Sequence, residues 1–227
     1  MIQNYGDFIA ALLQAGFSGA VGGKDDGAFA LFRYNEEGEG GLRWHTGDPE
    51  TDPWEWRMRV LDERNDIAYA KVFSRKAGYI MREWYPYFLA ARRGGRTAEQ
   101  DYAEGNLSIF ARRVYAVVAE HDALPLHEVK RLAGVTREEK GPFDAALIEL
   151  QMKLFLTLCG RQQKRSQSGE EYGWASTVLC TTEQFWGEAV FEEAAKLTAT
   201  EAEAAITRRV LELNPQAQER AVKKFIH

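Results

Sequence analysis

The feature that most constrains the fold is a series of helix and strand signals between residues 108 and 180. Ser108 is a suitable helix N-cap, and apolar residues recur at three- and four-residue steps after it. Three helices followed by a β-hairpin is the element order of a winged helix. The expected elements are helices from Ser108, over 124–133 and from Thr136, and strands over 153–159 and 172–180.

The remainder of the sequence predicts further helices and a few strands. Asp52, Pro53 and Glu55 have the pattern of an N-cap, N1 and N3, which predicts a helix start. Residues 28–34 and 42–45 predict a pair of strands. Segment 67–73 is compatible with a helix or a strand, and we interpret it as a helix. Capping patterns predict later helices from Thr97, from Thr181, over 200–214 and over 216–226.

These elements predict an α+β protein that is mainly α-helical. We divide the chain into three segments on this basis. The first is an N-terminal α/β region with a basic, aromatic segment, the second is a winged-helix module of three helices plus a β-hairpin wing, and the third is a set of C-terminal helices packed on the rest. Their bounds are 1–105, 106–181 and 182–227.

Basic side chains concentrate in one segment of an otherwise acidic chain. The net charge is −5, and residues 1–56 carry three basic and ten acidic side chains. Residues 57–96 carry ten basic and four acidic ones. This distribution favours a local anion-binding surface over general polycation behaviour. The same arginines and lysines suit salt bridges to the acidic N-terminal third equally well.

The composition also indicates the compartment. No segment approaches the roughly 18 apolar residues of a membrane helix, and the first residues lack the pattern of a secretory signal. Cys159 and Cys180 form no CxxC pattern and are too few for a disulfide framework, so reduced core cysteines are expected. We therefore expect a cytoplasmic protein with no membrane partner.

One segment points to a known family. Residues 67–86 are aromatic and apolar and end in the turn Glu83, Trp84, Tyr85, Pro86, and Arg92 and Arg93 follow. Such a segment, ahead of a winged-helix pattern, resembles the AlkZ/YcaQ-like winged-helix DNA glycosylases. The resemblance covers roughly residues 42–180. It implies DNA as the partner, and an enzyme that hydrolyses the N-glycosidic bond of alkylated bases and acts on interstrand crosslinks.

The chain departs from that group at its catalytic motif. In the glycosylases a Gln-x-Gln or Gln-x-Asp triplet positions the attacking water, and residues 1–99 contain neither triplet. The nearest counterpart is segment 52–57, which offers carboxylates and indoles without a paired amide. The resemblance thus implies base-excision activity that is lost or altered.

Base excision requires a group that holds water and a pocket that stacks an extruded base. Asp52 and Glu55 are the candidate catalytic acids, and Trp54, Trp56, Trp84 and Tyr85 are the candidate pocket. The alternative is that the two acids cap a helix and the aromatic rings belong to the core. The candidates for contacts with the DNA backbone are Arg75, Lys76, Arg92, Arg93, Arg161, Lys164 and Arg165.

We expect no metal and no cofactor. His45 lies near Asp48, Glu50 and Asp52, but acids in a Gly/Pro loop are typical of turns. The leading hypothesis is a DNA-associated winged-helix protein related to AlkZ-like glycosylases. The alternative is a non-catalytic protein–protein interaction module, which the acidic balance and the amphipathic C-terminal helices favour. A third hypothesis is a small-molecule enzyme or sensor with a tryptophan-rich pocket.

Overall fold

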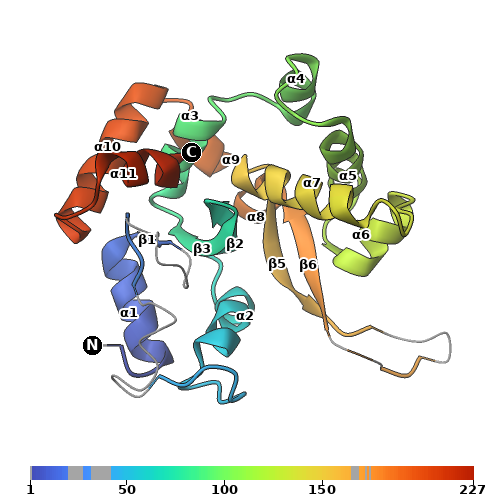
Figure 1. Cartoon of the computed structure of the whole chain (residues 1–227), viewed down its shortest axis with the longest axis horizontal. Helices are drawn as coiled ribbons and strands as arrows, with labels where there is room; N and C mark the ends of the chain where they lie inside the picture. The colour runs from blue at the N-terminus through green and yellow to red at the C-terminus, as the bar shows by residue number, and fades with distance from the viewer. Residues whose placement is uncertain (1, 20–27, 32–41, 165–168, 172, 174) are drawn as a thin grey trace. The chain divides into compact units, whose positions relative to one another are not determined.

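The computed structural model describes residues 2–19, 28–31, 42–164, 169–171, 173 and 175–227. The chain is an α+β protein in which helices predominate, and the strands pair antiparallel (Figure 1). Its elements fall into two compact units. Unit 1 comprises residues 1–95 and 188–227, and unit 2 comprises residues 96–187.

Unit 1 combines three antiparallel strands, in the order β1-β3-β2, with helices from both ends of the chain. β1 pairs with β3 at Phe17 and Ile80, and β2 pairs with β3 at Tyr69 and Tyr79. The elements are α1 (Tyr5–Ala15), β1 (Phe17–Ser18), α2 (Pro53–Glu63), β2 (Ile67–Phe73), β3 (Lys76–Met81), α3 (Tyr85–Arg92), α9 (Glu188–Ala194), α10 (Ala199–Leu213) and α11 (Glu219–Ile226).

The helix expected over residues 67–73 is wrong, because this segment is strand β2. Ser74 and Arg75 both have positive φ, at 48° and 67°. Two consecutive residues of this kind form the tight turn that suits a two-residue hairpin, and Phe73 faces Lys76 across it. The turn contains no Gly or Asn, so its usual sequence signal is absent.

The strand pair expected over 28–34 and 42–45 is also wrong where the structure describes it. Residues 28–31 and 42–45 form no strand, and residues 32–34 lie outside the described residues. Isolated hydrogen bonds to other parts of unit 1, instead of a strand ladder, hold these segments. Leu31 N–H donates to Ser18 Oγ at 3.0 Å, and Arg43 N–H donates to the Thr51 carbonyl at 3.3 Å.

Aromatic side chains form much of the core of unit 1. Phe8 stacks on Trp56 at 5.2 Å between ring centroids and meets Tyr79 edge-on at 5.2 Å. Phe225 of α11 stacks on Phe73 of β2 at 4.0 Å. The last helix is therefore packed directly on the sheet that the middle of the chain forms.

Unit 2 has three antiparallel strands in the order β5-β6-β4. An apolar cluster in its core includes Val114, Val118, Phe143, Leu150 and Leu179, which come from two helices and a strand. The elements are α4 (Ala98–Ala103), α5 (Ile109–Ala119), β4 (Leu124–Pro125), α6 (Leu126–Leu132), α7 (Lys140–Met152), β5 (Leu156–Gln162), β6 (Ser176–Thr181) and α8 (Thr182–Trp186).

The helix starts predicted at Asp52, Thr97, Ser108 and Thr181 are confirmed. Thr97 and Thr181 form capping boxes with Gln100 and Gln184, and the Ser108 side chain accepts the Ala111 N–H. The start predicted at Thr200 is wrong, because Thr198 caps α10 in a box with Glu201. Helix α7 starts at Lys140, four residues after the predicted Thr136.

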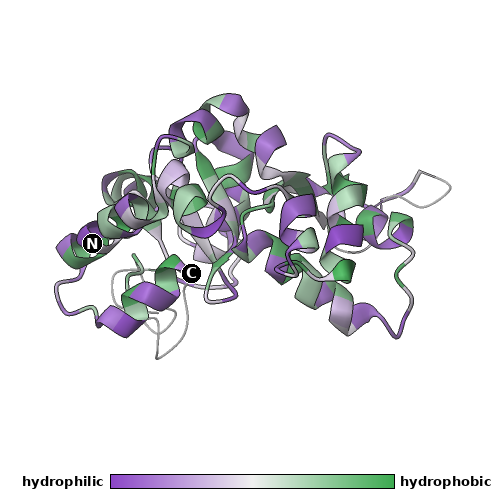
Figure 2. Ribbon diagram, turned by 90° about the horizontal axis from the view of Figure 1, so that it is seen from above, coloured by the Kyte–Doolittle hydropathy of each residue, from purple (hydrophilic) through white to green (hydrophobic). Residues whose placement is uncertain are grey.

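The helices carry hydrophilic and hydrophobic residues side by side (Figure 2). In α10 the apolar face is buried in unit 1, since Ile206 and Val210 are fully buried. None of the helices that the structure describes is long and apolar enough to cross a membrane.

The contact between Gly16 and the Trp84 ring provides a test of the packing in unit 1. It ends α1 with φ +90°, and a Cβ at this position would lie 2.2 Å from the Trp84 ring. We expect Gly16→Ala to lower the free energy of unfolding by about 3 kcal/mol, from left-handed backbone strain and overpacking together. Chemical denaturation measures this loss.

Gly95→Ala is the matched control. Gly95 has φ +78°, but no atom lies within 4 Å of an added Cβ, so only the backbone strain of about 1 kcal/mol is expected. Equal losses for the two variants would contradict the close approach of Trp84 to the backbone of Gly16.

Candidate nucleic-acid interface

The N-terminus of α2 is organised by the carboxylate of Asp52. This side chain is fully buried, and the prediction that Asp52 is the N-cap is confirmed. Its two oxygens accept four backbone N–H groups, those of His45 at 3.1 Å, Thr46 at 2.8 Å, Gly47 at 3.0 Å and Trp54 at 2.8 Å. A carboxylate offers about four acceptor sites, so Asp52 is saturated by the loop that it holds.

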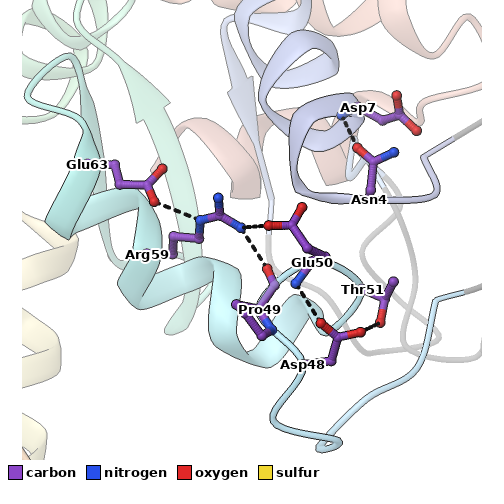
Figure 3. Close-up of polar contacts among 8 residues, drawn as sticks. All are labelled: Asn4, Asp7, Asp48, Pro49, Glu50, Thr51, Arg59 and Glu63. Atoms are coloured by element: carbon purple, nitrogen blue, oxygen red, sulfur yellow. Dashed lines mark hydrogen bonds and ion pairs between the residues drawn. The ribbon is translucent and has the colours of Figure 1, made fainter.

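The other acids of this loop also have partners within the protein (Figure 3). Asp48 accepts the Glu50 N–H at 3.0 Å and the Thr51 hydroxyl at 2.7 Å, and these bonds lower the pKa of Asp48. Arg59 donates to Glu50 at 2.7 Å, to Glu63 at 2.8 Å and to the Pro49 carbonyl at 3.0 Å. Turn formation and ion pairing thus account for the acids near His45.

The two tryptophans of α2 face opposite environments. Trp56 is fully buried, whereas Trp54 is 42% exposed. The Arg57 guanidinium lies 3.3 Å from the centroid of the Trp54 ring, and the His45 ring lies 4.7 Å from it. Glu55 lies between the tryptophans and is partly exposed. Trp54 is therefore the indole of this segment that a ligand in solvent can reach.

Trp84 and Tyr85 belong mainly to the packing of unit 1. Tyr85 is 1% exposed. Trp84 is partly buried and meets Phe17 edge-on, with 5.2 Å between the ring centroids. These two residues, like Trp56, occupy positions where the core rather than solvent surrounds much of the ring.

Arg92 and Arg93 lie against other parts of unit 1. Arg92 donates to the carbonyls of Phe225, at 3.0 Å, and of Ile226, at the end of α11. Burial lowers the pKa of Arg92 to about 9, so the side chain stays charged at neutral pH. Arg93 is 7% exposed and lies 5.4 Å from the centroid of the Phe191 ring.

Several other cations of the basic segment are paired with acids. Arg59 pairs with Glu50 and Glu63 (Figure 3), and Arg64 pairs with Asp66. Arg82 lies 3.6 Å from Glu193. The salt-bridge alternative therefore applies to these arginines, although their partners include acids outside the N-terminal third.

The remaining candidate cations lie on hairpins. Arg75 is exposed in the β2–β3 turn of unit 1, and Lys76 is partly exposed beside it. In unit 2, Arg161 is exposed near the end of β5, and Lys164 is partly exposed beyond it. Arg165 lies outside the described residues.

The buried carboxylate of Asp101 connects the first residue of unit 2, Arg96, to Lys153. Asp101 is 1% exposed and accepts hydrogen bonds from Arg96 at 2.6 Å and Lys153 at 3.1 Å. Burial raises the pKa of Asp101, but these two cations outweigh it and hold the pKa below its ordinary value. Arg96 and Lys153 thus have a structural partner within unit 2.

A protein-family model with the description "AlkZ related" matches residues 2–227 of the chain. Comparisons with curated proteins and with solved structures give no match.

The four hydrogen bonds to the Asp52 carboxylate can be tested through the free energy of unfolding. We expect Asp52→Ala to lower the free energy of unfolding by about 3 kcal/mol, because it removes the cap and leaves loop N–H groups without an acceptor. Glu55→Gln, three residues along α2, is the control and should change stability by less than about 1 kcal/mol. A loss below about 1 kcal/mol for Asp52→Ala, by chemical denaturation, would refute the organising role of this carboxylate.

The lowered pKa of Asp101 predicts that the stability of the protein depends on pH in the acid range. Its folded-state pKa is depressed, so its stabilising contribution is present above its ordinary pKa of 3.8 and is lost as the pH falls through the lower folded-state value. Asp101→Asn should cost about 2 kcal/mol at pH 7 and should reduce the decline in stability below about pH 4. Denaturant titrations across this pH range measure both effects.

The control for Asp101 is Asp122→Asn, which removes the same charge from an exposed position of unit 2. It should leave the acid decline unchanged. If Asp122→Asn and Asp101→Asn flatten the decline equally, general charge repulsion rather than the buried cluster sets the pH dependence.

Proposed function

Because the chain belongs to the AlkZ-related family over residues 2–227, we propose that it binds DNA through a winged-helix module in unit 2. The relation is the one that the sequence indicated, and it extends over nearly the whole chain.

The observation that carries this proposal is the topology of unit 2. The chain runs from α5 through β4, α6 and α7 into β5 and β6, and β6 lies between the other two strands. Three helices beside a small antiparallel sheet that ends in a hairpin is the arrangement of a winged helix. The β5–β6 hairpin takes the position of the wing.

The hairpin supplies cations where a wing would meet phosphates. Arg161 is exposed, Lys164 follows it, and Arg165 continues the basic run in the sequence. Positive side chains near a hairpin tip are typical of contacts with a phosphate backbone, which position a protein without reading bases. By contrast, α7 exposes Asp144 near its start, beside Lys140, so we assign it little base readout.

Unit 1 supplies features that suit an unstacked base. The exposed Trp54 ring is covered on one side by the Arg57 guanidinium at 3.3 Å. Aromatic faces and guanidinium groups both stack on bases. We therefore retain Trp54 as the stacking residue of the proposal, with Arg75 and Lys76 as further phosphate contacts, and omit Arg92 and Arg93.

For water activation, Glu55 fits better than Asp52. Asp52 already accepts four backbone N–H groups, whereas Glu55 is partly exposed on the same helix turn. The chain does contain a Gln-x-Gln triplet at Gln216, Ala217 and Gln218, but both glutamines are exposed around the start of α11. In the proposal, Glu55 is therefore the residue that positions the attacking water for base excision.

A second candidate function is protein–protein interaction. The pairing of Arg59, Arg64 and Arg82 with acids favours it, because these cations are engaged within the protein. The C-terminal helices support it less than their sequence suggested, since Ile206 and Val210 are buried within unit 1.

DNA titration tests the proposal. The wild-type chain should bind duplex DNA at ~50 mM salt, and the double variant Arg161→Ala with Lys164→Ala should bind about tenfold more weakly. Its log–log slope of affinity against salt should shrink by about 2, because two phosphate contacts are lost. Fluorescence anisotropy at several salt concentrations measures both quantities.

The matched control removes two exposed lysines of α11, as Lys223→Ala with Lys224→Ala. This double variant should keep the affinity and slope within about twofold of the wild type. Absence of binding by the wild type would favour the interaction module, and equal losses in both double variants would exclude a specific role of the hairpin. Release of an alkylated base that survives Glu55→Gln would contradict the assignment of Glu55.

A further inference from the structure

The only two cysteines of the sequence lie on neighbouring strands at the base of the β5–β6 hairpin. Thr157 faces Cys180, and Leu158 faces Leu179, but the next pair is Gly160 with Val178. Cys159 is therefore the extra residue of a β-bulge. Cys159 lies two residues along β5 from Thr157, the residue that faces Cys180, and the two thiols are neighbours.

The two thiols differ in exposure and acidity. Cys159 is partly exposed, whereas Cys180 is 3% exposed. The hydrogen bond from Cys180 lowers the pKa of Cys159, and the same interaction, with burial, raises the pKa of Cys180. A partly exposed thiol of lowered pKa beside a second thiol is the arrangement of a redox-sensitive pair, whereas isolated core cysteines are inert.

The bulge allows the backbone at Cys159 to adjust, which disulfide formation with Cys180 requires. Bonded sulfurs are about 2 Å apart, so bond formation requires side-chain rotation and a small backbone adjustment. A bulged residue lies outside the regular ladder, and Gly160 beside it has φ +150°. This is the part of the β5–β6 pair where such an adjustment disturbs the fewest ladder hydrogen bonds.

We propose that Cys159 and Cys180 are a reversible oxidative modification site, at which a peroxide converts the two thiols into an intramolecular disulfide. The Cys159 thiolate attacks one peroxide oxygen, the O–O bond breaks, and Cys159 becomes a sulfenic acid while hydroxide leaves and is protonated to water. The Cys180 sulfur then attacks the Cys159 sulfur, the S–O bond breaks, and a second water leaves. Two thiols are oxidised by two electrons, and the peroxide is reduced to two waters.

The product would fix one strand to the other beside the hairpin that carries Arg161. A low-molecular-weight thiol reverses the reaction by thiol–disulfide exchange. The inference does not depend on DNA binding, because the modification is read out on the protein alone.

The test begins with the reduced full-length chain and a small excess of hydrogen peroxide. Intact mass should fall by two hydrogen atoms, both thiols should become unreactive to a maleimide under denaturing conditions, and a non-reduced digest should contain a Cys159–Cys180 linked peptide. A thiol reductant should restore both. Persistence of two free thiols, a linkage between chains, or sulfinic acid at Cys159 with a free Cys180 would overturn the proposal.

Two variants test the order of events. Cys180→Ala should leave a sulfenic acid at Cys159 that dimedone captures, and Cys159→Ala should leave the buried Cys180 thiol reduced under the same treatment. Cys159 is partly exposed, so Cys159→Ala keeps the test valid even if circular dichroism shows that Cys180→Ala does not fold. Oxidation of Cys180 at the wild-type rate in Cys159→Ala would contradict the role of Cys159 as the attacking thiol.

Discussion

Two arginines hold the C-terminal helices to the N-terminal half of the chain by binding the carbonyls at helix C-termini. Arg92 of α3 donates to Phe225 and Ile226 at the end of α11, and Arg209 of α10 donates to Gln14 and Ala15 at the end of α1. The last turn of a helix exposes unpaired carbonyls and carries partial negative charge, so a guanidinium satisfies both at once. These bonds join residues that are 133 to 195 positions apart in the sequence. They explain why unit 1 includes residues 188–227.

Because arginines bind helix carbonyls and acids within the protein, the basic segment 57–96 is a weaker indication of an anion-binding surface than its sequence suggests. Ten basic side chains in forty residues resemble an anion-binding surface when counted along the sequence. In the fold, Arg92 binds helix carbonyls, and Arg59, Arg64 and Arg82 pair with acids. Local charge density thus overestimates the surface charge, because helix ends and carboxylates compete with an external ligand for the same guanidinium groups. The proposal therefore relies on the exposed Arg75 and Arg161 of the hairpins, and not on the charge count of the segment.

Helix starts were predictable from the sequence because capping is local. Asp52, Thr97, Ser108 and Thr181 each bond a backbone N–H two or three residues ahead, so a short stretch of sequence contains the whole signal. The same pattern at Thr136 and Thr200 was wrong, because a nearby residue is the N-cap. The β2–β3 hairpin was not predictable in this way. Its turn places Ser74 and Arg75 at positive φ, a conformation that the pairing of the flanking strands imposes and that neither residue favours alone.

The candidate site was predictable only in part, for a geometric reason. Trp54 and Trp56 are two positions apart on α2, so they point in very different directions around the helix. The sequence marks both as aromatic, but tertiary packing against Phe8 decides that Trp56 is the buried one. The proximity of Cys159 to Cys180 was likewise not predictable, because the bulge that shifts the register depends on contacts between strands.

Asp52 shows how a structural role limits chemistry at the same atom. A carboxylate that positions water must keep an acceptor site for that water's proton, and the four N–H donors of the 45–54 loop occupy the sites of Asp52. Removing a donor to admit water would release the loop that places Trp54 beside His45. The residue that organises this surface is therefore poorly suited to act on a ligand there. Chemistry at this surface would need a carboxylate other than Asp52, such as the partly exposed Glu55 of the proposal.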